Sequence, residues 1–326
     1  KSVSMLWALG SNEEREAIEK AHHDAVNETL HWVEDTALYT RDSSSGVGKL
    51  TKTSGMIAAQ FDHFETRAGD PDLHTHVAVS NKVFDPSANK WKSIEGRSLL
   101  RHVATASSRY NLTLMDKLTA SLGVQFAPRG MGEGKIPVYE IDGVPDSLSL
   151  AGSKRRQSIT EATQALVDDY VTRHGRSPSS ALMYKLSQQA TLSTREGKGE
   201  ASSLADLRGR WRSEFAEMAG GQHALDTLMS GVTNRGSDST LWKSEQVSDT
   251  RLQVPGHGTQ ERGIILATIA AEAVRLAGSR RTNFTDRHLD SAVSQTLRGY
   301  RPAAGEKLMD LHAQVIKQAK DHAISL

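Results

Sequence analysis

The pattern of apolar and polar residues in the first half of the chain predicts strands mixed with two long helices. Apolar residues recur every three or four positions over about 11–38 and again over 98–122, a spacing that places them on one face of a helix. The first of these segments begins with a capping-box signature, in which Ser11 is followed three residues later by Glu14. Shorter apolar segments bounded by turn residues are predicted to be strands. They cover 1–9, 55–63, 73–84, 123–126 and 136–141.

The pattern becomes helical throughout from about Ser149 onward. Glycine-containing breakers, such as Gly175–Pro178 and Gly220–Gly221, divide this part of the chain into separate helices. The chain is therefore expected to divide into an α/β part, residues 1–150, and a helical part, residues 151–326. The predicted helices cover 153–174, 178–194, 203–219, 223–232, 261–279, 285–299 and 304–325.

Composition narrows the class of protein. A chain of 326 residues is long enough for one large domain or two ordinary ones. The formal net charge of +1 excludes a general polycation but permits a local basic groove. Without cysteine the chain has no disulfide and no thiolate metal site, which fits a reducing compartment such as the cytoplasm. No apolar run approaches the roughly 20 residues of a membrane span, and no signal peptide is visible.

Three histidines gather in one strand-like stretch, residues 61–83. His74 and His76 are two positions apart in a predicted strand, so both rings point to the same face. His63 ends the preceding predicted strand, and the segment between the strands, 68–72, has the composition of a turn. A hairpin in the right register brings the three imidazoles together.

Three converging imidazoles are typical of a catalytic metal site, because they leave coordination positions open. Such an ion acts as a Lewis acid toward a phosphoryl oxygen. The softness of imidazole as a ligand matches Zn, Ni, Cu or Fe. Mg and Mn prefer oxygen, so they would need further oxygen ligands such as substrate phosphate and water. The competing interpretation is that the three histidines are ordinary packing residues.

The histidine stretch is one of several segments that form a wider motif pattern. They cover 1–10, 21–26, 30–34, 39–41, 55–63, 70–77, 139–145 and 153–156. Together these segments resemble the MobF-type conjugative relaxases, which are members of the HUH endonuclease superfamily. The similarity spans roughly residues 1–160 and is weaker through the helices that follow.

The resemblance implies an α+β fold, an antiparallel sheet with flanking helices called the palm, followed by a mostly helical region that closes over DNA like fingers. It implies a relaxase that nicks one strand of a plasmid transfer origin, where a tyrosine attacks the scissile phosphate and becomes joined to the DNA. His63, His74 and His76 would hold a divalent cation, with Mg or Mn in use and Zn or Ni as alternatives. The implied partners are single-stranded origin DNA and accessory proteins of the relaxosome, in the bacterial cytoplasm.

The sequence departs from the family pattern in two places. The family's catalytic tyrosines and an acidic residue precede the segment that begins here at Lys1, so we expect the nucleophile upstream and no cleavage by this chain alone. Among its own tyrosines, Tyr39 and Tyr110 are the first to test. After the first histidine, Glu65 replaces a small residue, and we expect it either in a solvated turn or against the ion. Arg67 keeps its place and is expected to contact a phosphate.

Further cations are predicted to contact the DNA backbone, which positions a protein without specifying sequence. Some lie in or beside a predicted flexible hairpin tip at 42–54, one lies at the end of the histidine stretch, and others begin the first helix of the helical part. With Arg67, the predicted contacts are Arg41, Lys49, Lys52, Lys82, Lys154, Arg155 and Arg156.

Three alternatives to a conjugative relaxase stay open at this point. A rolling-circle replication initiator shares the histidine-bearing sheet. A metal-dependent hydrolase would use activated water and need Asp62 or Glu65 as general base. A DNA-binding module of the same fold would bind DNA without catalysis.

Overall fold

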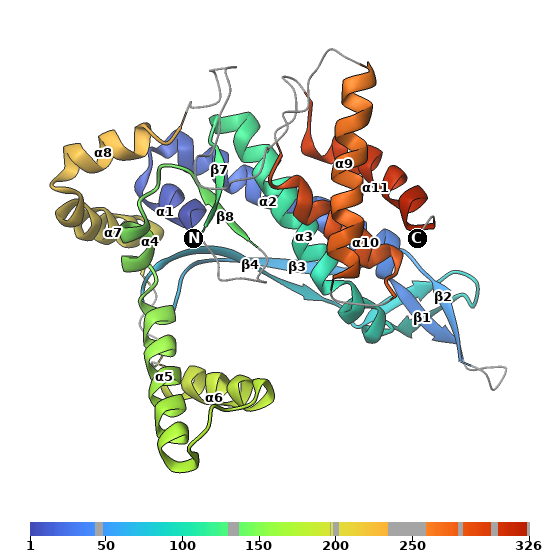
Figure 1. Ribbon diagram of the computed structural model, residues 1–326, viewed down its shortest axis with the longest axis horizontal. Coiled ribbons are helices and arrows are strands. Elements are labelled where there is room, and N and C mark those ends of the chain that lie inside the picture. The colour runs from blue at the N-terminus through green and yellow to red at the C-terminus, as the bar shows by residue number, and fades with distance from the viewer. Residues whose placement is uncertain are drawn as a thin grey trace. The chain divides into compact units, whose positions relative to one another are not determined.

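The computed structural model describes residues 1–42, 48–129, 137–195, 197, 202–233, 259–279, 283–300 and 306–324 (Figure 1). Its helices are α1 Ser2–Leu9, α2 Asn12–Ala37, α3 Gly96–Leu122, α4 Asp146–Ala151, α5 Lys154–His174, α6 Ser180–Ser193, α7 Leu204–Ala219, α8 Gln222–Ser230, α9 Thr259–Gly278, α10 Asp286–Leu297 and α11 Leu308–Ile324. Its strands are β1 Tyr39–Asp42, β2 Lys49–Lys52, β3 Ala58–Glu65, β4 Pro71–Val79, β5 Lys82–Asp85, β6 Lys90–Ser93, β7 Phe126–Arg129 and β8 Val138–Ile141. The predicted α+β class is confirmed.

The strands form four two-stranded sheets, each made of neighbours along the chain. The pairs β1–β2, β5–β6 and β7–β8 are antiparallel, and Tyr39 pairs with Lys52 at one end of the first. The segment predicted as one strand over 73–84 is interrupted at residues 80–81 and forms part of β4 and most of β5. Of the predicted hairpin tip at 42–54, residues 43–47 lie outside the described residues, as does residue 136 at the start of another predicted strand.

The segment 1–9 is a helix, α1, and its prediction as a strand was wrong. Every residue of α1 except Val3 is buried, so the segment carries no polar stripe. A short run that is apolar on all sides gives no periodic signal, and such runs do not distinguish a buried helix from a buried strand. The helix ends at Gly10, whose backbone N–H donates to the Leu6 carbonyl.

The periodic helices are confirmed. Both α2 and α3 lie within two residues of the predicted bounds. The capping box is present, because Ser11 N donates to Glu14 Oε2 at 2.7 Å and Glu14 N donates to Ser11 Oγ at 3.2 Å. The later helices α5 to α11 follow their predicted order, whereas the short helix α4 was not predicted. None of the described helices is long and apolar enough to cross a membrane.

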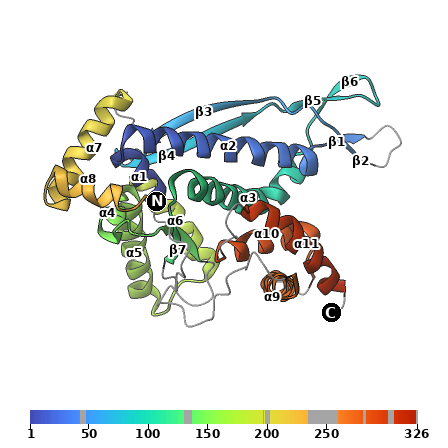
Figure 2. The ribbon, with the colours of Figure 1, turned by 90° about the horizontal axis from the view of Figure 1, so that it is seen from above.

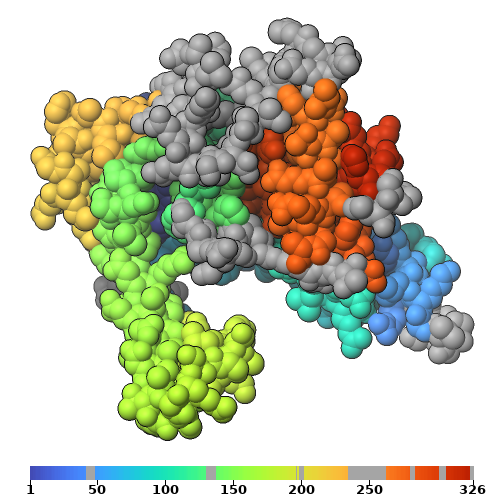
Figure 3. Space-filling model, viewed as in Figure 1, coloured from blue at the N-terminus to red at the C-terminus, as the bar shows by residue number. Residues whose placement is uncertain are grey.

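One compact unit consists of residues 1–15, 61–76 and 143–232. Its core contains the buried side chains of Trp7 from α1 and of Trp211 and Phe215 from α7. Helix α1 packs against α4, α7 and α8. Helix α5 packs against α6 (Figure 3). The part of the histidine stretch that carries the three histidines, residues 61–76, belongs to this unit.

The other unit consists of residues 16–60, 77–142 and 233–326. Helices α9, α10 and α11 pack together, and α10 and α11 lie against α3 (Figure 2). Their shared core includes Leu112, Ile269, Val293, Leu311 and Val315. Each unit takes segments from both sides of residue 150, and the division of the chain into domains 1–150 and 151–326 stays a prediction.

Asp290 on α10 forms an ion-pair centre that joins three helices. Arg109 of α3 donates from Nη1 to both carboxylate oxygens, at 3.1 and 3.2 Å. His312 of α11 lies with Nε2 3.2 Å from Oδ1, at ion-pair distance but without the geometry of a hydrogen bond. Burial raises the pKa of Asp290, but His312 and Arg109 more than reverse this effect, so the pKa lies below its ordinary value.

Replacing Asp290 by asparagine is expected to destabilise this helix cluster by about 3–5 kcal/mol, because it leaves the Arg109 charge without a counter-charge. A lowered carboxyl pKa stabilises the fold above the ordinary pKa of about 4, and this contribution is lost as the pH falls below it. The difference in unfolding free energy between wild type and Asp290→Asn should therefore be smaller at pH 3 than at pH 7. Urea unfolding of wild type and variant at pH 7 and pH 3 measures both effects.

The matched control is Asp24→Asn in α2. Asp24 pairs with Lys20 on the helix surface, so its replacement should cost no more than about 0.5 kcal/mol. Equal losses in the two variants would contradict the structural role assigned to Asp290.

Candidate metal centre

The histidine stretch forms a hairpin in which β3 and β4 pair around a tight turn. Within the turn, Thr66 N donates to the Asp70 carbonyl at 2.9 Å and Gly69 N donates to the Thr66 carbonyl at 3.0 Å. Gly69 has a left-handed backbone, with φ of +73°, and an added Cβ would lie 3.1 Å from Nη2 of Arg210. The left-handed backbone favours glycine here, and a side chain would also have to displace the end of Arg210.

The hairpin brings His63, His74 and His76 together, as the alternation of side chains predicted. The ring centroids of His63 and His74 are 5.3 Å apart, those of His63 and His76 4.6 Å, and those of His74 and His76 5.1 Å. One ring nitrogen from each residue lies within 4.8 Å of the other two. His63 and His76 are exposed and His74 is half-buried, so the cluster opens to solvent on one side.

The orientation of His74 is set by its own strand. Its Nδ1 lies 2.8 Å from the backbone carbonyl oxygen of Asp72, and a carboxylate oxygen of Asp72 lies 3.5 Å away. Because a carbonyl only accepts hydrogen bonds, Nδ1 carries the proton and the lone pair sits on Nε2. Metal-binding histidines are commonly held in this way by an outer partner.

These donors fit a divalent metal ion. Three imidazoles with ring nitrogens within 4.8 Å of one another, on an open face, match the ligand set of a catalytic rather than a closed site. Among the described residues, no other group of three or more histidine or carboxylate side chains lies so close together. The identity of the metal does not follow from the ligands alone.

Asp62 and Glu65, the two carboxylates considered as a general base for a hydrolase, have other partners. Glu65 Oε2 lies 3.2 Å from Nη2 of Arg210, and it is not a member of the histidine cluster. Asp62 Oδ1 accepts from Thr75 Oγ1 at 2.5 Å, a pair across the hairpin. Asp62 precedes His63 directly, so along the strand its side chain points to the opposite face.

The predicted DNA contacts divide into two groups. Several are engaged within the protein. Lys154 pairs with Glu214, and Arg155 donates to the carbonyls of Thr194 and Thr191. Arg41 lies 3.4 Å from Glu95. Lys82 donates to Ser93. The remaining four predicted contacts have exposed side chains, and their role in DNA binding stays a hypothesis. They are Arg67, Lys49, Lys52 and Arg156.

Tyr110, one of the two tyrosines named as possible nucleophiles, has a structural place. Its hydroxyl lies 2.7 Å from Nδ1 of His22, which is itself buried between α2 and α3. Burial raises the pKa of Tyr110 to about 12. A phenol with so high a pKa is harder to deprotonate and therefore a poorer nucleophile. Tyr39 begins β1 and is half-buried.

Sequence reasoning missed the residues that hold the turn of the hairpin, above all Asp70 and Trp211. The pair Asp70-Pro71 signals a turn but gives no sign that the carboxylate is buried. A tryptophan on an amphipathic helix predicts a core residue, and nothing local connects it to a turn 142 positions earlier.

The fold is that of the conjugative relaxases. The structure of conjugative relaxase TrwC in complex with oriT DNA, metal-free, matches with a TM-score of 0.52 and 24% identity over 67% of this chain and 70% of that one. The metal-bound TrwC complex with oriT DNA matches with a TM-score of 0.53 and 23% identity, over 71% and 69% of the two chains. At these identities the likeness concerns the fold.

The chain belongs to the TrwC relaxase family, whose model matches residues 1–218. The multifunctional conjugation protein TraI of Escherichia coli is 30% identical over 171 residues. That match covers 50% of this chain and 9% of TraI, so the chain matches only a small part of this relative. The resemblance to MobF-type conjugative relaxases is thereby confirmed.

Proposed function

We propose that this chain binds single-stranded DNA at a conjugative transfer origin and holds the scissile phosphate against a divalent cation bound by His63, His74 and His76. The observation that carries the proposal is the convergence of the three imidazoles on one open face, in a chain of the TrwC relaxase family. The relatives solved with oriT DNA, one of them metal-bound, support both the partner and the ion.

The residues of the chain have distinct parts in this mechanism. A bound divalent cation would supply a Lewis acid for the phosphoryl oxygen. His74 presents Nε2 because its Nδ1–H is held by the Asp72 carbonyl. The exposed sides of His63 and His76 leave room for a phosphate to approach. Arg67, exposed just beyond the end of β3, places a positive charge beside the incoming DNA backbone.

We further propose that the nucleophile is not one of the six tyrosines of this sequence. None of the six stands in the sequence context of the family's catalytic tyrosines. Tyr110, in addition, is half-buried with its hydroxyl 2.7 Å from Nδ1 of His22, and its raised pKa opposes nucleophilic attack. The chain then supplies the metal and the DNA-binding surface of the reaction, and the attacking group comes from elsewhere.

The alternative functions have less support. The family match favours conjugative relaxases over rolling-circle replication initiators. A hydrolase would need Asp62 or Glu65 as a general base, and these carboxylates are engaged by Thr75 and Arg210. A DNA-binding module without catalysis would bind DNA without the metal, whereas the proposed function requires the metal to hold the scissile phosphate.

DNA binding tests the proposal. A single strand from the transfer origin that accompanies the gene should bind at least about tenfold more tightly than a scrambled strand of equal composition, measured by fluorescence anisotropy. The logarithm of the binding constant should fall with the logarithm of salt concentration, and Arg67→Ala should reduce that slope by about 0.7, the effect of one lost phosphate contact. Equal binding of both strands would contradict the proposal.

A further inference from the structure

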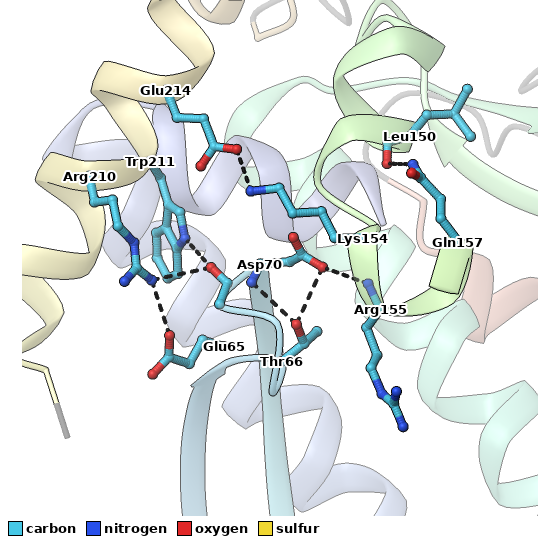
Figure 4. A network of polar contacts seen from close by, with 11 residues as sticks. Glu65, Thr66, Asp70, Leu150, Lys154, Arg155, Gln157, Arg210, Trp211 and Glu214 are labelled. Carbon is cyan, nitrogen blue, oxygen red and sulfur yellow. Dashed lines mark hydrogen bonds and ion pairs between the residues drawn. The ribbon is translucent and has the colours of Figure 1, made fainter. Parts of the chain in front are cut away.

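The turn of the histidine hairpin is held by residues from a distant part of the chain (Figure 4). Trp211 of α7 is fully buried and donates from Nε1 to the Gly69 carbonyl at 2.7 Å. Its ring lies 5.9 Å from that of Trp7, and Trp7 stacks on Phe64 with ring centroids 5.6 Å apart. Phe64 follows His63 directly, so one aromatic contact chain runs from α7 to the strand that carries His63.

Asp70 provides a second attachment. Its carboxylate is buried, and Oδ2 accepts hydrogen bonds from the backbone N–H of Arg155, at 3.2 Å, and from Thr66 Oγ1, at 3.3 Å. Arg155 lies in the first turn of α5, whose own N-cap residue, Ser153, makes no side-chain capping bond. Asp70 thus caps α5 from another part of the chain and closes the turn with the same oxygen.

Arg210 adds a third attachment beside Trp211. Its Nη2 lies 3.2 Å from the Glu65 carboxylate, at the end of β3, and 3.3 Å from the Gly69 carbonyl. We refer to Asp70, Arg210 and Trp211 together as the turn clasp. The clasp fixes both the end of one strand and the turn that leads to the next.

The hairpin needs such support because of where its histidines lie. A two-stranded hairpin is marginally stable by itself. A slip of one residue in its register would move the histidines of one strand to the opposite face. His63 and His76 are exposed and therefore contribute little burial that could hold the register. The contacts of the clasp run from Glu65, two residues after His63, to Asp70, four residues before His74. This is the part of the hairpin where the register is decided.

We propose that Asp70 and Trp211 are positioning residues for the metal centre. By holding the turn from α5 and α7, they set the relative placement of the three imidazoles and thereby the affinity for the metal. This inference rests on the proposed role of the histidines as ligands. It assigns to the distant segment 154–211 a part in the metal site that is separate from any contact with DNA.

The experiment uses the full chain and compares matched variants. Trp211→Phe keeps an aromatic ring in the core but removes the donor to Gly69. Phe215→Leu, on the same helix, loosens the same core without touching the turn. Mn²⁺ affinity by isothermal titration calorimetry should fall about tenfold in Trp211→Phe, the loss typical of an outer-shell change, and change less than about twofold in Phe215→Leu. Urea unfolding records the stability of each variant.

Asp70 gives an independent pair of variants. Asp70→Ala removes the acceptor for Arg155 N and should weaken Mn²⁺ binding about tenfold, whereas Asp70→Asn retains a side-chain oxygen and should restore most of the affinity. In the metal-free chain, the histidine ring signals in NMR spectra should move in Trp211→Phe and Asp70→Ala but not in Phe215→Leu.

The outcomes separate the two proposals. If His74→Ala binds Mn²⁺ as tightly as wild type, the proposed metal site fails, and the NMR comparison alone decides whether the clasp positions the rings. If His74→Ala abolishes binding but Trp211→Phe and Asp70→Ala bind normally with unmoved ring signals, the clasp proposal is overturned. It is also overturned if Phe215→Leu weakens binding as much as Trp211→Phe.

Discussion

Replacing His74 by alanine is expected to remove most of the bound metal while leaving the fold intact. Loss of a residue that merely holds a metal ligand typically weakens metal binding 10- to 100-fold. The variant loses one of the three ligands itself, so we expect its metal affinity to fall by about 100-fold or more. Because His74 is only half-buried and lies among exposed rings, the cost in stability should be small. Elemental analysis of the purified protein and calorimetric titration with Mn²⁺ measure the metal, and circular dichroism follows the fold.

The matched control for this variant is His31→Ala. His31 lies exposed on α2 and is not a member of the cluster, so its replacement should leave metal content unchanged. Equal metal content in His74→Ala and wild type would show that the three histidines are not the ligands.

Incubation of the chain with a labelled origin oligonucleotide and Mg²⁺ or Mn²⁺ is expected to give no covalent protein–DNA adduct. The hydroxyl of Tyr110 lies 2.7 Å from Nδ1 of His22, its pKa is raised to about 12, and no tyrosine of the sequence stands in the family's catalytic context. Denaturing gel electrophoresis detects an adduct as a band of DNA label at protein mass. The positive control is a relaxase of the same family with its catalytic tyrosines, assayed with its own origin strand.

An adduct formed by this chain would contradict the account of the nucleophile. The variants Tyr39→Phe and Tyr110→Phe would then identify the attacking residue. Absence of an adduct together with normal binding of origin DNA is the expected combination, because binding and cleavage depend on different residues.

Local rules predicted much of the fold from sequence. The stripes of apolar residues defined α2 and α3, and the Ser11–Glu14 capping box placed the start of α2 within one residue. The same rules failed for α1, because a helix buried on every side has no polar face to reveal its period. The assembly of two units from interleaved segments was also beyond local patterns, since it depends on contacts between distant residues.

The metal site shows the same limit. Alternation along a strand and a turn between two strands were enough to predict that His63, His74 and His76 converge. The partners of the turn could not be predicted, because Trp211 and Gly69 are 142 positions apart and Asp70 caps a helix 85 positions away. The DNA contacts were predicted only by charge, and charge does not tell an exposed cation such as Arg156 from one engaged within the fold such as Arg155.

The most direct test of the central claim is an anomalous difference map from crystals of the chain loaded with Mn²⁺. We expect one strong peak within coordination distance of a ring nitrogen of His63, His74 and His76, and no such peak in His74→Ala crystals grown in the same way. A peak bound elsewhere, or a cluster that stays empty at saturating Mn²⁺, would contradict it.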